Sequence, residues 1–371
     1  MINSTKISLR QFTILTMFYT IGTTILVIPS SLAADAKQNA WLAAAVGWLI
    51  GLLIVYLYIS LGKLFPELTL FGFLERTLGK WFGKLVSLAF IFFFFTGAAS
   101  VLYYMGNFMT TQVMPETPLG AFVLLFGGLV VMGLRLGLEV LARTSEILFP
   151  WFLILFTVST LFVSPEIDLE KIKPILDVGM KPTLKAALSF LGTASLPLVA
   201  FLMFFPANLN HTKGAGKAFF VGTLLGGIAI IIVTFMSISV LGADFTARNM
   251  YPSYALAKKI NIANFIQRVE ILMAGMWFMS IFFKTTFYAY GFITGIAQLC
   301  GCKDYRPLVL PCGMIFISYS MIIYPNVVYM MDFDSTVYIP YVITVCLLLP
   351  LLLYATGLMR KRMEQKPSAS E

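Results

Sequence analysis

Tyr19-Thr-Ile-Gly-Thr-Thr-Ile-Leu-Val-Ile-Pro29 interrupts the first of about ten apolar stretches in this chain. A membrane-spanning helix needs roughly 20 apolar residues to cross about 30 Å of hydrocarbon. Inside that layer every peptide group must be paired within the protein. Glycine and threonine in mid-span, with proline one turn later, weaken the helix where an unpaired backbone group costs most, unless the freed groups line a cavity and hold a ligand. The stretch therefore predicts ligand-binding residues at Gly22, Thr23 and Thr24.

The composition defines the class of protein. Of 371 residues, 59% are hydrophobic and only 12% are charged, whereas soluble domains have about 25% charged residues. We expect an all-α polytopic membrane protein. Residues 1–363 are predicted to form a single integral membrane, transporter-like domain and 364–371 a short disordered cytoplasmic tail. The predicted spans are 9–34, 39–62, 85–113, 118–136, 143–163, 186–206, 216–242, 265–297, 307–326 and 337–359.

Lysine and arginine in the loops set the expected orientation, because cytoplasmic loops carry an excess of them. With the N-terminus in the cytoplasm, sixteen of the 26 basic residues lie on the inner side and nine on the outer side. Eight of the outer nine lie in two longer loops, 164–185 and 243–268, so Lys37 is the single basic residue in a short outer loop. Both termini are therefore predicted to be cytoplasmic. The net charge of +9 is explained by contact with an anionic lipid bilayer rather than with nucleic acid.

Catalytic and metal sites have little support in the sequence. The four cysteines lack metal-ligand spacing, and His211 is the only histidine, so neither a histidine metal cluster nor a Ser-His-Asp triad is expected. No phosphate-binding loop or hydrolase motif is present. We therefore expect no enzyme activity, no metal and no cofactor.

A polar stripe follows one face of span 3, because its members are three and four residues apart. The surrounding side chains are apolar, so the stripe faces protein or a cavity rather than lipid. Hydrogen bonding between helices and a cavity wall both remain open interpretations. The stripe consists of Thr96, Ser100, Tyr103, Tyr104, Asn107, Thr110 and Thr111.

Span 8 contains Lys284 midway along its length, too deep for its side chain to reach the interface. Trp277 and Ser280 share its face, and Thr285 and Thr286 lie beside it. A buried ammonium needs a partner, and no carboxylate is predicted at the same depth. Backbone carbonyls of the break in span 1, hydroxyls, water or a ligand carboxylate are the candidates. Lys284 and Trp277 are therefore assigned either a structural role or a role in ligand or proton coupling.

Span 6 contains a second break, Ser189-Phe-Leu-Gly-Thr-Ala-Ser-Leu-Pro197. Spans 1 and 6 occupy corresponding positions in a five-plus-five inverted repeat, and paired broken helices at such positions indicate a site in mid-membrane. Half-helix N-termini there present free N–H groups that suit a carboxylate. Gly192, Thr193 and Ser195 thus join the predicted binding residues.

The longer outer loops have structure of their own in this prediction. Residues 164–185 are expected to hold a short surface helix. Residues 251–260 are expected to form an amphipathic helix, with proline near its start. A plain interfacial helix and a lid over a binding cavity both remain open for the second segment.

The chain resembles the B subunits of endospore germinant receptors, the GerAB-type spore germination permeases. The likeness rests on the ten-span layout, on residues 21–29, and on the region from Tyr251-Pro through Leu256-Ala-Lys and Phe265-Ile-Gln-Arg-Val-Glu270 to Trp277. The resemblance implies a LeuT-like fold of the amino acid–polyamine–organocation superfamily, with broken helices 1 and 6. It also implies a pocket glycine at Gly22, a pocket aromatic at Tyr103 or Tyr104, and a pocket hydroxyl at Thr285 or Thr286.

The same resemblance implies a function and partners. The expected protein is a nutrient-sensing subunit of the spore inner membrane that binds a small germinant, such as an amino acid, and acts with an A subunit and a C subunit. In related LeuT-like carriers that lack Na⁺, a lysine ammonium takes the place of the cation, which is one interpretation of Lys284. A proton-coupled amino-acid permease and a scaffold for the partner subunits are the alternatives.

Overall fold

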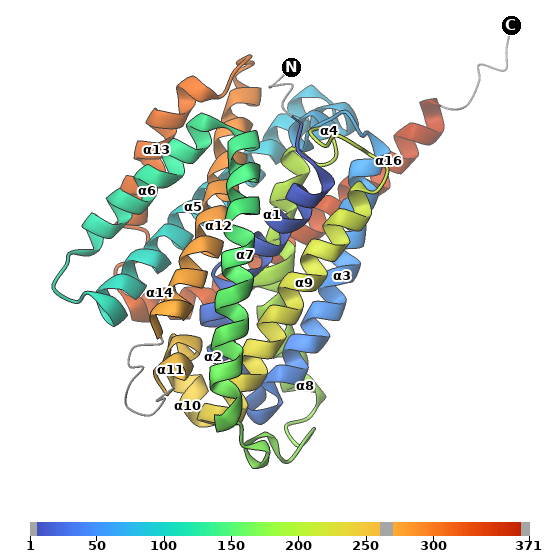
Figure 1. The fold of residues 1–371 in the computed structure, drawn as a ribbon. Helices are drawn as coiled ribbons and strands as arrows, with labels where there is room; N and C mark the ends of the chain where they lie inside the picture. The colour runs from blue at the N-terminus through green and yellow to red at the C-terminus, as the bar shows by residue number, and fades with distance from the viewer. Residues whose placement is uncertain (1–5, 260–269, 365–371) are drawn as a thin grey trace, which may run out of the picture.

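The computed structural model describes residues 6–259 and 270–364. The described chain is built almost entirely of helices, arranged as a bundle (Figure 1). Residues 365–371 of the predicted tail, residues 265–269 of the family motif and residue 260 of the 251–260 segment lie outside the described residues, whereas Glu364 is the last residue of α16. The first half of the bundle contains α1 (Leu9–Ile21), α2 (Thr24–Ala36), α3 (Ala40–Leu64), α4 (Leu70–Leu78), α5 (Lys80–Phe108), α6 (Leu119–Leu136) and α7 (Leu138–Val163).

The second half begins with the broken span α8 (Met180–Phe190), η5 (Leu191–Ser195) and η6 (Leu196–Met203). Two short helices, α10 (Ala243–Arg248) and α11 (Pro252–Lys258), interrupt the series of spans. The remaining spans are α9 (Ala215–Met236) with η7 (Ser237–Leu241), α12 (Glu270–Leu299), α13 (Arg306–Ser320), and the last helical segment with α14 (Val327–Phe333), η8 (Asp334–Tyr338), α15 (Ile339–Ile343), η9 (Thr344–Leu348) and α16 (Leu349–Glu364).

Eight helical segments of the described chain are long and apolar enough to cross a membrane. The segment from Thr24 to Leu64 joins the second half of the broken first span to the second span. At 13 and 15 residues, α1 and α13 are each too short to be counted with these eight. The all-helical, multi-pass architecture expected from the sequence is confirmed.

Burial differs sharply between spans, and this difference locates the centre of the bundle. In its most apolar window, the broken span Met180–Met203 is 83% buried, whereas the segment Leu138–Glu166 is 17% buried. The two halves of the first span, α1 and α2, both contact η5. The two interrupted spans therefore meet in the interior, where water is excluded and each freed backbone group needs a protein or ligand partner.

The two ends of the bundle differ in what they carry. The start of α1, the end of α16 and α4 lie at one end, whereas α10 and α11 lie at the other (Figure 1). The first end carries Lys63, Arg76 and Lys80, three of the residues predicted to be cytoplasmic. We refer to it below as the basic end.

Three segments differ from their expected form. The last span begins at Val327, ahead of the predicted start at residue 337. The prediction started late because Asp332, Asp334 and Ser335 lower the hydropathy of this part of the helix. Residues 164–172 form two 3₁₀ turns, Ser164–Glu166 and Leu169–Ile172, and α8 already begins at Met180. Helix α11 packs inward, since Ser253 and Leu256 are buried and the helix contacts both α2 and α12.

Candidate functional site

The break in the first span is centred on Gly22, between α1 and α2. Gly22 adopts φ +27° and ψ −121°, a conformation that residues with a side chain rarely adopt. A Cβ atom at Gly22 would lie 2.2 Å from Cδ of Lys284, well inside contact distance. Both the backbone conformation and the close approach of Lys284 therefore require glycine here.

The second half of this span starts without a capping side chain. Thr23 occupies the N-cap position of α2, but its hydroxyl accepts no hydrogen bond from the first turn. A helix N-terminus carries free N–H groups and a partial positive charge. The start of α2 is therefore suited to an anionic group. The single hydroxyl proton of Ser280 is shared between the carbonyl oxygens of Gly22, at 3.3 Å, and Trp277, at 3.0 Å.

The break in the sixth span is a π-helical turn, η5, followed by the 3₁₀ segment η6 that contains Pro197. Proline has no N–H, so the carbonyl four residues earlier, that of Thr193, loses its helical partner. Thr193 O instead accepts two hydrogen bonds from side chains. Lys284 Nζ donates one at 2.7 Å, and Thr24 Oγ1 donates the other at 3.4 Å. Lys284, on α12, thus supplies a donor for a carbonyl of η5 and also contacts the start of α2.

Neighbouring carbonyls of the same break are also paired with side chains from other spans. The Tyr338 hydroxyl donates to Gly192 O at 3.1 Å, and the Tyr19 hydroxyl donates to Pro197 O at 3.0 Å. The Tyr58 hydroxyl donates to Leu196 O at 2.9 Å. Side chains of five helical segments therefore hold the unwound backbone of the sixth span: α1, α2, α3, α12 and η8.

Lys284 is the charged group of this centre. It is 2% exposed, and its Nζ lies 3.3 Å from Thr24 Oγ1 and 5.8 Å from the centre of the Tyr19 ring. Among the described residues no carboxylate lies within ion-pair distance of it. An ammonium has three donors, and the described contacts of Lys284 use two of them. A protonated Lys284 therefore has one donor without a partner among the described residues, available to a further group.

The other predicted residues lie around this centre in different ways. Ser195 faces α3, where a Cβ on Gly51 would lie 2.1 Å from Ser195 Oγ. Thr285 and Thr286 donate to carbonyls of their own helix, those of Ile281 and Phe282. The Trp277 ring packs edge-on against Phe108, with 4.7 Å between ring centres, and its indole N–H is buried without a described partner.

The two span-3 tyrosines separate clearly in the structure. The Tyr103 ring is buried and packs edge-on against Tyr324, at 5.1 Å between ring centres. The Tyr104 hydroxyl instead donates to the carboxylate of Asp334. Neither tyrosine contacts Lys284 or the break at Gly22 through a described hydrogen bond.

Sequence reasoning missed Asp334 and Tyr338, which lie at the two ends of the π-helical turn η8. The predicted span began at residue 337, which left Asp334 in a loop. The signal that marks them is a run of Asp, Ser and Thr inside a helix whose flanks are apolar. Through η8, the last span contacts both the polar stripe of α5 and the break of the sixth span.

Residues 6–328 match the family described as spore germination protein. The chain belongs to this family. It is 28% identical to spore germination protein KB of Bacillus subtilis (strain 168) over 99% of this chain and 98% of that one. It is 26% identical to the putative spore germination protein YfkT of the same organism over 91% and 92% of the two chains.

A solved structure supports the fold of this family member. The crystal structure of MhsT in complex with L-phenylalanine superposes with a TM-score of 0.67, covering 94% of this chain and 97% of that one at 14% identity. At this identity the likeness concerns the fold alone. It confirms the predicted LeuT-like fold, in which broken helices 1 and 6 meet at the centre.

Proposed function

We propose that this protein is the nutrient-sensing membrane subunit of a spore germinant receptor. A small germinant, such as an amino acid, binds between the two breaks and triggers germination. The observation that carries the proposal is the free donor of buried Lys284 beside the uncapped start of α2. The names of the relatives, all spore germination proteins, support the biological role.

The chemistry of the centre favours a carboxylate. Lys284 supplies a positive charge without an acidic partner among the described residues, and α2 directs its first N–H groups to the same region. Hydrogen bonds between charged partners contribute about 1.5–3 kcal/mol, more than neutral ones do. A ligand carboxylate would satisfy both groups at once. Gly22, Thr23, Thr24, Gly192 and Thr193 supply the backbone and hydroxyl contacts around it.

The proposed setting follows from the charge pattern and the family. In this proposal the basic end, with the start of α1 and the end of α16, faces the cytoplasm, and the membrane is the spore inner membrane. The protein acts together with the receptor A and C subunits. A side chain of the outer half, Ser253 on α11, donates to Ile25 O at 2.6 Å, so α11 is placed to report the state of the first break to such partners.

A proton-coupled amino-acid permease is the second candidate. The observation that favours it is the LeuT-like fold shared with MhsT, whose structure contains L-phenylalanine. Sensing and transport would both use a site between the two breaks, so the contacts of Lys284 do not separate them. A pure scaffold for the receptor subunits would need no pocket at all.

One experiment distinguishes the candidates. The purified full-length protein is reconstituted in liposomes, and binding and uptake of radiolabelled L-amino acids are measured, with the corresponding amino-acid amides as competitors. We expect saturable binding without accumulation, and no competition by amides, because these lack the carboxylate. Accumulation against a gradient would instead identify a permease. Competition by amides equal to that of the acids would refute the proposed role of Lys284.

A further inference from the structure

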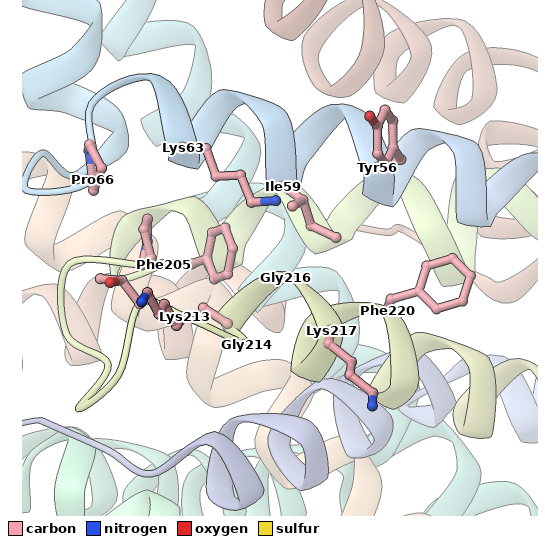
Figure 2. Close-up of a pocket in the computed structure, with 13 residues that line it drawn as sticks. Tyr56, Ile59, Lys63, Pro66, Phe205, Lys213, Gly214, Gly216, Lys217 and Phe220 are labelled. Atoms are coloured by element: carbon pink, nitrogen blue, oxygen red, sulfur yellow. The ribbon is translucent and has the colours of Figure 1, made fainter.

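A groove separate from the broken spans lies at the basic end of the bundle. It runs between the end of α3 and the start of α9, beside Phe205 and Pro206, and has a volume of about 680 Å³ (Figure 2). None of the predicted binding residues lines it. It therefore needs its own explanation.

Three lysines line this groove: Lys63 on α3, and Lys213 and Lys217 around the start of α9. In Figure 2 the Lys63 side chain extends from α3 toward Gly216, whereas Lys217 extends from α9 away from α3. The absence of a side chain at Gly216 makes room for this approach, since a Cβ there would lie 3.6 Å from Lys63 Cε and 2.8 Å from Ile59 Cγ2. Within the described part of the chain, none of the three lysines forms an ion pair.

The groove changes from charged to apolar along its length. Tyr56, Ile59 and Lys63 are spaced by three and four residues and so share one face of α3. Tyr56 is 67% exposed and Phe220, on α9, is 37% exposed. Exposed aromatic rings next to lysines are typical of the boundary between headgroups and hydrocarbon. A soluble anion would use the basic part alone, whereas an amphipathic ligand uses both parts.

We propose that this groove binds an anionic phospholipid. The headgroup phosphate lies between Lys63 and Lys213, and the acyl chains lie along Tyr56 and Phe220. Three unpaired cations repel the positive choline or ethanolamine of a zwitterionic lipid, so a headgroup with net negative charge is preferred. Basic pockets between spans at the cytoplasmic side are a known form of lipid recognition. This proposal does not depend on the identity of the germinant.

The test compares lipids on the full-length protein in detergent. Phosphatidylglycerol and phosphatidylcholine are titrated, and binding is measured by native mass spectrometry and by the shift in unfolding temperature. The variant is Lys63→Gln with Lys213→Gln. The matched control, Lys80→Gln with Lys303→Gln, removes the same charge from exposed positions outside the groove. Inorganic phosphate is a third ligand.

We expect phosphatidylglycerol to bind the wild type more tightly than phosphatidylcholine does. The groove variant should bind it about 25-fold more weakly, about fivefold for each lysine, with an unchanged unfolding temperature in phosphatidylcholine. The control should match the wild type.

An equal loss in the control would show a general charge effect and overturn the proposal. A stabilisation by inorganic phosphate equal to that by phosphatidylglycerol would also overturn it, because the site would then be one for a soluble anion. Loss of folding in the groove variant would be checked with Lys213→Gln alone, for which an unchanged lipid affinity would overturn the proposal.

Discussion

Lys284 Nζ donates a hydrogen bond at 2.7 Å to the carbonyl oxygen of Thr193, the group that Pro197 leaves without a helical partner. This bond ties α12 to the break of the sixth span and, through Thr24, to the break of the first span. A ligand that takes the third donor of Lys284 therefore acts on both breaks at once. Under the proposed function, a ligand at this position would therefore change the contacts of three spans.

The first prediction concerns Lys284→Met. Removing a buried charge lowers the cost of membrane insertion by about 2.5–3.5 kcal/mol, so the variant should be made at normal levels. Its affinity for a carboxylate ligand should fall about 10- to 100-fold, the equivalent of one charge-assisted hydrogen bond. Lys284→Arg should fold poorly, because a planar guanidinium does not fit the space of a compact ammonium beside Gly22. Ligand binding to the purified Met variant is the measurement, and wild-type affinity there would contradict the assignment.

The second prediction concerns Gly22→Leu. The leucine side chain would occupy the position of the Lys284 side chain and force an unfavourable φ, at a cost of about 1–3 kcal/mol. Germinant response and ligand binding should be lost. Gly128→Leu is the control, since a Cβ at Gly128 meets nothing within 4 Å. Dose–response curves of germination for both variants, with protein levels measured alongside, provide the check. A normal curve for Gly22→Leu would refute the site.

The breaks show what sequence predicts and what it leaves open. Glycine, hydroxyl residues and a following proline indicate where each span is interrupted, because each proline leaves one carbonyl without a partner. Ile25 O, freed by Pro29, accepts from Ser253, and Cys346 O, freed by Pro350, accepts from Tyr58 at 2.6 Å. The sequence shows which carbonyls lack a helical donor, because proline acts locally. It does not show which side chains replace that donor, because these come from distant spans and depend on how the spans pack.

Asp334 illustrates a second limit. Hydropathy places span boundaries by the density of apolar residues, and acidic and hydroxyl residues at the start of the last helix lower that density. The helix nevertheless continues through these residues, and the carboxylate of Asp334 accepts a hydrogen bond from the hydroxyl of Tyr104. A tertiary contact has extended a span beyond the boundary that composition alone indicates.

The third prediction concerns Tyr58→Phe. The single proton of the Tyr58 hydroxyl is shared between Leu196 O and Cys346 O, at 2.9 and 2.6 Å, so the change removes one donor from two buried carbonyls. Hydrogen bonds between membrane helices contribute about 0.6 kcal/mol on average and up to about 1.7. We expect a loss of about 0.6–1.7 kcal/mol in unfolding free energy, measured by denaturant titration in micelles. Tyr354→Phe is the control, because its hydroxyl has no hydrogen bond within the described residues. Equal stability of both variants would show that the two carbonyls do not need Tyr58.

The last prediction separates the two tyrosines of the polar stripe. Tyr104→Phe removes the donor to the half-buried carboxylate of Asp334 and should cost about 1–3 kcal/mol, the penalty for leaving such a group unpaired. Tyr103→Phe should cost less than about 0.5 kcal/mol, since its hydroxyl has no hydrogen-bond partner in the described part of the chain.

If the penalty arises from Asp334, adding Asp334→Asn to Tyr104→Phe should recover part of it, because a neutral amide is cheaper to leave unpaired than a carboxylate. Unfolding free energies of the wild type, Tyr104→Phe, Asp334→Asn and the double variant form a double-mutant cycle. Strict additivity in that cycle would show that Tyr104 and Asp334 act independently and would contradict the pairing.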